Sequence, residues 1–222
     1  MAKMLIIVTN HATLGETDEK NGTYAPELTH ALKVFIDAGL EYDIASINGG
    51  AAPLYGEDID DEVNQTLLAN ADFQSRINNT LTAAELNNAD YAAVYFPGGF
   101  GLLSDLASNA DVAAITASLY ESGKVVGAVC HGPAALLPVE LSDGSSLLAT
   151  KHVTAFTREE EIDFGTIDNI PFLLEEALAR KSGKYSKVAP WLVHVISDGQ
   201  LVTGQNPASA HAVGETMVAL IS

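Results

Sequence analysis

The stretch that decides the fold is Val125-Val126-Gly127-Ala128-Val129-Cys130-His131-Gly132-Pro133. Its first five residues predict a buried strand, and Gly132-Pro133 favours a sharp turn into a helix. We therefore expect the Cys130 side chain to be exposed at a strand-to-helix elbow, beside the first N–H groups of the next helix. Such groups favour a thiolate and can bind an oxyanion, so the sequence predicts a nucleophilic cysteine. A lone cysteine can also be a small buried apolar side chain.

Apolar runs alternate with helical patterns on both sides of this elbow. The patterns predict strands at 5–8, 42–47, 91–96, 124–129 and 152–156, a hairpin of 192–196 with 201–203, and helices at 24–38, 112–121, 134–139, 170–181 and 209–221. The alternation predicts an α/β fold, doubly wound, with a mostly parallel sheet and helices on both faces. In such folds, sites gather at the carboxyl ends of the strands, where Cys130 and Pro97-Gly98-Gly99 both fall.

The composition predicts one domain over residues 1–222. The chain has 222 residues, 47% of them hydrophobic, which is enough for a sizeable core. No Pro/Gly/Ser-rich linker divides it, although residues 48–88 are less regular and predict an insertion near the mouth of the site.

The charge and the single cysteine limit the function classes. The formal net charge of −18 argues against nucleic acid or an anionic membrane as a partner. One cysteine excludes an intrachain disulfide and fits a reducing compartment. The N-terminal apolar run is too short for a signal peptide, and no stretch approaches the ~20 apolar residues of a membrane span. We therefore expect a soluble, cytoplasmic protein.

Several side chains are candidate partners of Cys130. Glu27 follows Pro26 in the first turn of a predicted helix, where it either favours the helix dipole or moves protons beside a thiol. Any of Glu159, Glu160 and Glu161 could orient His131 in a Cys-His-acid triad, although a run of acids is usually a solvated surface. Pro97-Gly98-Gly99 could aim one N–H at an oxyanion. The six histidines show no zinc-type spacing with the cysteine, so we expect neither a metal nor a cofactor.

Several motifs together resemble the ThiJ/PfpI family, and within it the glyoxalase III and heat-shock chaperone branch. The resemblance spans nearly the whole chain. It rests on the motifs Gly22-Thr23-Tyr24 with Pro26-Glu27, Pro97-Gly98-Gly99, Ala128-Val129-Cys130-His131-Gly132-Pro133, Thr154-Ala155-Phe156 with Glu161-Ile162, Pro190-Trp191, and 201–209, which reads Leu-Val-Thr-Gly-Gln-Asn-Pro-Ala-Ser. The resemblance implies the flavodoxin-like fold of class I glutamine amidotransferase domains.

The resemblance also implies roles for individual residues. Cys130 would be the nucleophile, His131 the triad histidine, Glu161 the triad acid, and Glu27 the carboxyl against the thiol. The N–H groups of Gly99 and His131 would form the oxyanion hole. Many members read Pro-Gly-Gly-His-Gly where this chain has Phe100 in place of the histidine, so a binding role of that side chain is in question here.

The function implied by the resemblance is that of a glutathione-independent glyoxalase III, which converts the 2-oxoaldehyde methylglyoxal to lactate through a cysteine hemithioacetal. Three alternatives stay open: an amidase or peptidase with the same Cys-His-acid set, a stress holdase with an apolar patch, and a redox sensor in which Cys130 is oxidised. The resemblance also implies a homodimer, the commonest assembly.

Overall fold

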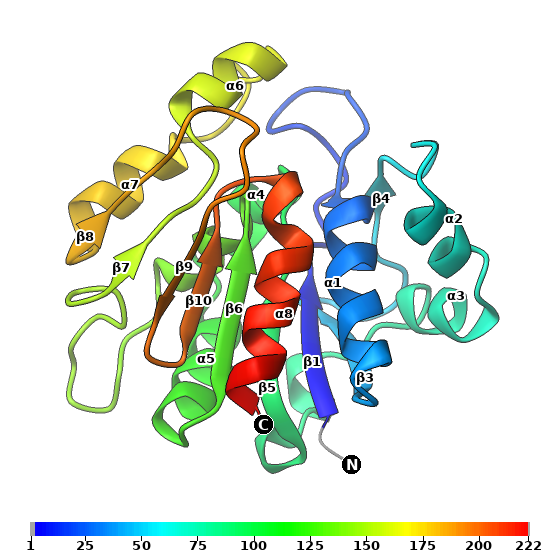
Figure 1. Cartoon of the computed structure of the whole chain (residues 1–222), viewed down its shortest axis with the longest axis horizontal. Helices are drawn as coiled ribbons and strands as arrows, with labels where there is room; N and C mark the ends of the chain where they lie inside the picture. Colours follow the sequence, from blue (N-terminus) through cyan, green and yellow to red (C-terminus); the bar gives the residue numbers. More distant parts are fainter. Residues whose placement is uncertain (1–2, 222) are drawn as a thin grey trace.

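The computed structural model describes residues 3–221, and a central sheet runs through them (Figure 1). Six strands of these residues form it in the order β3-β1-β5-β6-β10-β9, and two short two-stranded sheets pair β2 with β4 and β7 with β8. The strands are β1 (Lys3–Val8), β2 (Thr23–Tyr24), β3 (Glu41–Ser46), β4 (Leu54–Tyr55), β5 (Tyr91–Phe96), β6 (Val125–Val129), β7 (His152–Val153), β8 (Lys184–Tyr185), β9 (Val195–Asp198) and β10 (Leu201–Gly204).

The helices cover the sheet and extend beyond its edges. The α-helices are α1 (Ala25–Asp37), α2 (Glu62–Leu68), α3 (Ala71–Ile77), α4 (Gly101–Asp105), α5 (Ala110–Glu121), α6 (Arg158–Phe164), α7 (Leu174–Lys181) and α8 (Ala210–Ile221), and the 3₁₀ turns are η1 (Ala83–Glu85), η2 (Asn88–Asp90), η3 (Gly132–Leu136) and η4 (Pro207–Ser209). Figure 1 shows α1 and α8 side by side on one face of the sheet and α5 on the other.

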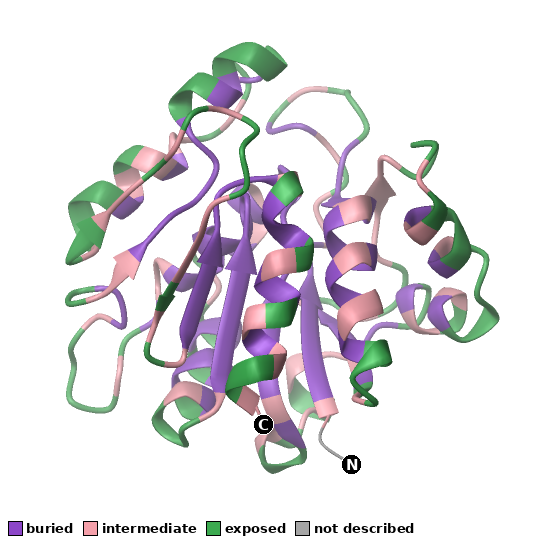
Figure 2. Cartoon of the chain, in the orientation of Figure 1, coloured by how far each residue is buried: buried purple, intermediate pink, exposed green. Residues whose placement is uncertain are grey.

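The sheet is buried on both faces because its strands are apolar at successive positions. In β1, Met4, Ile6 and Val8 belong to one core cluster, with α1 and α8, whereas Leu5 and Ile7 belong to a second cluster, with α5. Figure 2 shows the central strands buried along almost their whole length. This two-sided burial is typical of parallel sheets. All ladders of the central sheet are parallel except that of β10 with β9.

The predicted fold class is confirmed. The first five strands in space follow the flavodoxin-like order, and the chain reverses its winding between β1 and β5. That one domain spans residues 1–222 stays a prediction. The segment 48–88, expected to be irregular, contains β4, α2, α3 and η1. No helix within residues 3–221 is both long and apolar enough to cross a bilayer.

Four predicted elements differ in the structure. The first strand of the hairpin, expected at 192–196, is β9 at Val195–Asp198, so that only Gly199 and Gln200 separate it from β10. The other three differ for local reasons. The helix expected at 134–139 is the 3₁₀ turn η3. Its hydrogen bonds join residues three positions apart, as from Leu137 N–H to the Ala134 carbonyl. The strand expected at 152–156 ends at Val153, because Thr154 N–H donates to a side chain, the Thr203 hydroxyl. The helix expected from 170 begins only at Leu174, since Pro171 disfavours the helical conformation at the residue before it.

Candidate active site

Cys130 occupies a strained elbow directly after β6. Its φ of 59° lies in the left-handed region, which is costly for a side chain with a Cβ. Two backbone bonds hold this conformation: Cys130 N–H donates to the Gly204 carbonyl, and Phe156 N–H donates to the Cys130 carbonyl, both at 3.0 Å. The elbow is thus fixed from β10 and from the segment after β7. The side chain lines a pocket but is only 4% exposed, whereas the sequence predicted an exposed one.

His131 lies between the cysteine and a carboxylate. Its Nδ1 is 3.4 Å from Cys130 Sγ, and its Nε2 is 2.7 Å from Glu161 Oε1. Glu161 is held in turn by the Thr166 hydroxyl, which donates to Oε2 at 2.5 Å. A carboxylate that accepts from Nε2–H favours the neutral tautomer with a bare Nδ1. Nδ1 is therefore oriented to accept the thiol proton.

The three acids after the strand at 152–153 have separate surroundings. Glu159 is exposed and pairs with Lys187 Nζ at 2.7 Å, whereas Glu160 and Glu161 are buried. Only Glu161 of the three contacts His131. The tertiary structure therefore selects Glu161 among the candidates that the sequence left open.

Glu27 is the most unusual charged group of the site. It lies in the first turn of α1, is 0% exposed, and neither carboxyl oxygen has a hydrogen-bond partner within residues 3–221. A Cβ on Gly98 would come within 2.2 Å of its Oε2 and 2.7 Å of Cys130 Cβ, so Gly98 lets the two side chains approach. Burial raises the pKa of Glu27 from 4.5 to about 8, although the nearby Cys130 thiol and Gly98 N–H lower it in part.

The same surroundings raise the pKa of the Cys130 thiol well above 9. The largest cause is burial, followed by the negative charge of the adjacent Glu27 and by the charges of Glu160 and Glu161. The helix expected after Cys130, whose first N–H groups would favour a thiolate, is only the short 3₁₀ turn η3. A thiol with a raised pKa needs a base when it reacts.

The pocket above Cys130 is lined mostly by aromatic rings. Its volume is about 270 Å³, and its lining consists of Tyr24, Tyr55, Phe100, Cys130, His131, Phe156, Phe164, Trp191, Pro207 and Ala208. The Phe100 and Phe156 rings lie against the His131 ring, with centroids 4.5 and 4.7 Å from its own. These rings restrict the rotation of the imidazole and exclude water from it.

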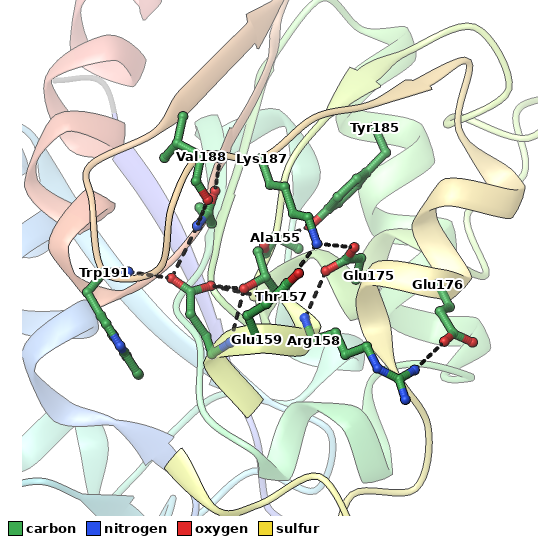
Figure 3. A network of polar contacts seen from close by, with 12 residues as sticks. Ala155, Thr157, Arg158, Glu159, Glu175, Glu176, Tyr185, Lys187, Val188 and Trp191 are labelled. Atoms are coloured by element: carbon green, nitrogen blue, oxygen red, sulfur yellow. Dashed lines mark hydrogen bonds and ion pairs between the residues drawn. The ribbon is translucent and has the colours of Figure 1, made fainter. Parts of the chain in front are cut away.

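Glu160 binds to three segments that border the pocket; Thr157 and Trp191, which lie in two of them, are labelled in Figure 3. Its Oε2 accepts from the Thr157 N–H and hydroxyl at 2.9 and 2.8 Å, a capping box at the start of α6. Its Oε1 accepts from Trp191 N–H at 2.9 Å, Gln205 Nε2 at 3.2 Å and Asn206 Nδ2 at 2.8 Å. The pattern Thr157-x-x-Glu160 could have signalled the cap, but no pattern signalled the other three bonds.

Gly99 and His131 follow β5 and β6, two neighbouring parallel strands, so both backbone N–H groups lie at the same edge of the sheet as Cys130. Gly99 has a φ of 126°, and a Cβ there would come within 2.2 Å of the Gly22 carbonyl oxygen. This position therefore requires glycine. No group of three or more His, Cys, Asp or Glu side chains in residues 3–221 is arranged to hold a metal ion.

The chain matches the model of the DJ-1/PfpI family over residues 20–220. It belongs to that family. It is 33% identical over 227 residues to a Saccharomyces cerevisiae protein named glutathione-independent glyoxalase HSP31, with 95% of this chain and 94% of the relative covered.

Two solved structures resemble this member of the DJ-1/PfpI family. The Francisella tularensis Rapid Encystment Protein 24 kDa has a TM-score of 0.95 and 33% identity, with the whole of both chains covered. Glyoxalase III from Candida albicans has a TM-score of 0.87 and 28% identity, with 100% of this chain and 98% of that chain covered. Relatives named as glyoxalases support an enzymatic role for this chain.

Proposed function

We propose that this protein is a cysteine-dependent, glutathione-independent glyoxalase III that converts methylglyoxal to lactate, a lyase. The observation that carries the proposal is the contact of Cys130 Sγ with a His131 ring oriented by Glu161, beside the buried and unpartnered Glu27. The names of the relatives at about 30% identity support the same activity.

The first step joins the cysteine to the substrate. Cys130 Sγ attacks the aldehyde carbon while the thiol proton moves to His131 Nδ1. The aldehyde oxygen becomes an oxyanion, which the N–H groups of Gly99 and His131 stabilise before it takes up a proton. The product is a hemithioacetal on Cys130.

The second step moves hydrogen between two carbons. The Glu27 carboxylate removes the proton from the former aldehyde carbon, and the electron pair forms an enediol. Reprotonation at the neighbouring carbon turns the ketone into an alcohol, while the first carbon becomes a thioester. Water hydrolyses the thioester to lactate and restores the thiol. One carbon is oxidised and the other reduced, so no external oxidant is needed.

Glu27 suits this base role because its pKa of about 8 is near the working pH, where proton transfer in both directions is efficient. An ionised Glu27 is required for the second step. We therefore expect kcat/KM to rise with pH through about 8.

The test is lactate formation from methylglyoxal without glutathione. We expect Cys130→Ala to abolish it and Glu27→Gln to lower kcat by about 10²–10⁴-fold, with folding retained. Glu161→Gln should lower kcat by a similar ~10²–10⁴-fold, because the amide no longer holds the required imidazole tautomer.

The matched control is Glu159→Gln, which changes an exposed acid two residues away and should leave turnover unchanged. Substantial turnover by Cys130→Ala would refute the mechanism. A folded wild-type protein without turnover would refute the function, and peptide cleavage and aggregation assays would then test the hydrolase and holdase alternatives.

The aromatic pocket of about 270 Å³ supports a small aldehyde rather than a peptide substrate, because a peptidase needs an extended open groove. We also propose that the protein acts in the cytoplasm, where its single cysteine stays reduced, and that it is a homodimer. Sedimentation equilibrium checks the assembly.

A further inference from the structure

The pocket is larger than its proposed small substrate requires. An engineered cavity of about 150 Å³ is enough to bind benzene. The pocket above Cys130 has about 270 Å³, whereas methylglyoxal is a three-carbon molecule with only a methyl group beyond its two carbonyls. Methylglyoxal would leave most of this volume to water.

The lining favours an apolar occupant for that volume. Its rings are in contact from one side to the other: Tyr24 with Tyr55 at 4.9 Å between centroids, Phe100 with Phe164 at 5.8 Å, and Phe156 with Trp191 at 5.7 Å. No Lys, Arg, Asp or Glu of the described chain lines the pocket. A charged substituent would therefore lose its water without gaining an oppositely charged partner.

Phe100 forms a part of the apolar wall that lies against His131. It is 3% exposed, its ring lies 4.5 Å from the His131 ring, and it contacts both Tyr55 and Phe164. A phenylalanine side chain offers no hydrogen bond to a polar substituent. Phe100 therefore favours an apolar substituent beside the imidazole.

We propose that the site prefers 2-oxoaldehydes whose substituent is aromatic or a bulky apolar group. The preference rests on the proposed function, because the dicarbonyl end must reach Cys130 while the substituent fills the aromatic part of the pocket. With phenylglyoxal the reaction takes up one water: the aldehyde carbon is oxidised to a carboxyl, the ketone carbon is reduced to an alcohol, and mandelate leaves as the Cys130 thiol is restored.

The test compares kcat/KM for phenylglyoxal and methylglyoxal on the full-length protein. We expect phenylglyoxal to be at least about tenfold better, because a buried phenyl ring removes far more apolar area from water than a methyl group does. Phe164→Ala should lower kcat/KM for phenylglyoxal about tenfold and that for methylglyoxal by less than about threefold.

Ile162→Ala is the matched control. Ile162 lies on the same helix, α6, and has the same exposure as Phe164, 54%, but it does not line the pocket. Ile162→Ala should leave kcat/KM unchanged for both substrates. A Phe164→Ala variant that loses activity on both substrates equally would overturn the preference.

The outcomes separate the two proposals. If the wild-type protein converts methylglyoxal at least as well as phenylglyoxal, the substrate preference is wrong and the glyoxalase function stands. If the folded protein converts neither, the function is wrong, and the preference fails with it.

Discussion

At the scale of single residues, Glu27 combines a cost in stability with the base role that we propose for it. Its carboxyl is completely buried without a hydrogen-bond partner in the described chain, so folding disfavours the charged form and raises its pKa to about 8. Enzymes often retain such groups although they lower the stability of the fold, because a proton-transfer group needs a pKa near the working pH. The pKa of the Cys130 thiol is raised by the same main cause, burial, and the charge of Glu27 raises it further.

The sign of the pH effect on stability follows from this shift. The folded protein keeps the Glu27 proton up to about pH 8, whereas an unfolded chain loses it near 4.5. The free energy of unfolding therefore falls as the pH rises from about 4.5 to about 8, by on the order of 5 kcal/mol at ~1.4 kcal/mol per pKa unit.

Glu27→Gln should remove this fall, because glutamine is neutral at every pH. We expect the variant to match the wild type near pH 4.5 and to exceed its stability increasingly towards pH 8, as urea unfolding at a series of pH values would measure. The opposite trend, a variant that loses stability relative to the wild type as the pH rises, would mean that Glu27 is ionised and well partnered in the folded protein.

At the scale of elements, buried polar side chains hold together segments of the site that are distant in the sequence. Glu160 fixes the start of α6, the Trp191 segment and the chain after β10, with five hydrogen bonds to one carboxylate. Trp191 has a φ of 65°, a conformation that needs such support. α6 also carries Glu161 and Phe164, so this one anchor positions a catalytic candidate and part of the pocket wall.

Glu160→Gln should weaken the contacts that join the start of α6, the Trp191 segment and the chain after β10. A glutamine has only one accepting oxygen, so at least one set of donors would face its amide N–H₂, at a cost of about 2–4 kcal/mol. Trp191 is the only tryptophan of the chain, so its fluorescence reports on this segment. We expect lower stability to urea and stronger quenching of the emission by acrylamide.

Glu159→Gln, one residue away but exposed and bonded to Lys187, is the control and should change neither measurement. Unaltered quenching in Glu160→Gln would show that the Trp191 segment is held by other contacts.

At the scale of the whole molecule, the charge is strongly unbalanced. The chain has 29 acidic and 11 basic residues, so most carboxylates lack a cationic partner. Surface ion pairs such as Lys33 with Asp37 contribute only about 0–1 kcal/mol each, and salt weakens them. General repulsion among the unpaired acids destabilises the folded state, and salt weakens this as well.

We expect this repulsion to outweigh the attraction within the ion pairs, because acidic residues outnumber basic ones. We expect the melting temperature to rise when NaCl is increased from about 0.01 to 0.15 M, which shortens the Debye length from about 30 to 8 Å. Differential scanning calorimetry measures the melting temperature at a fixed protein concentration and pH. A melting temperature that falls with NaCl would show that the ion pairs outweigh the repulsion.

The sequence by itself determined the fold class and the place of the nucleophile. Strand and helix patterns act locally, through side-chain periodicity, so the five parallel strands and the elbow at Cys130 could be predicted. The family motifs indicated Glu27, His131 and Glu161 as candidates. The short elements α2, α3, α4 and α6 were missed because they have too few turns to display a period.

Only the tertiary structure decided which groups meet. Glu159, Glu160 and Glu161 are identical in a sequence pattern, yet one pairs with Lys187, one anchors Trp191 and one contacts His131. The rise in the pKa of Cys130 likewise comes from burial and from the charges of residues distant in sequence, which no local pattern shows. Contacts and desolvation belong to the packed molecule, and a local pattern in the chain does not contain them.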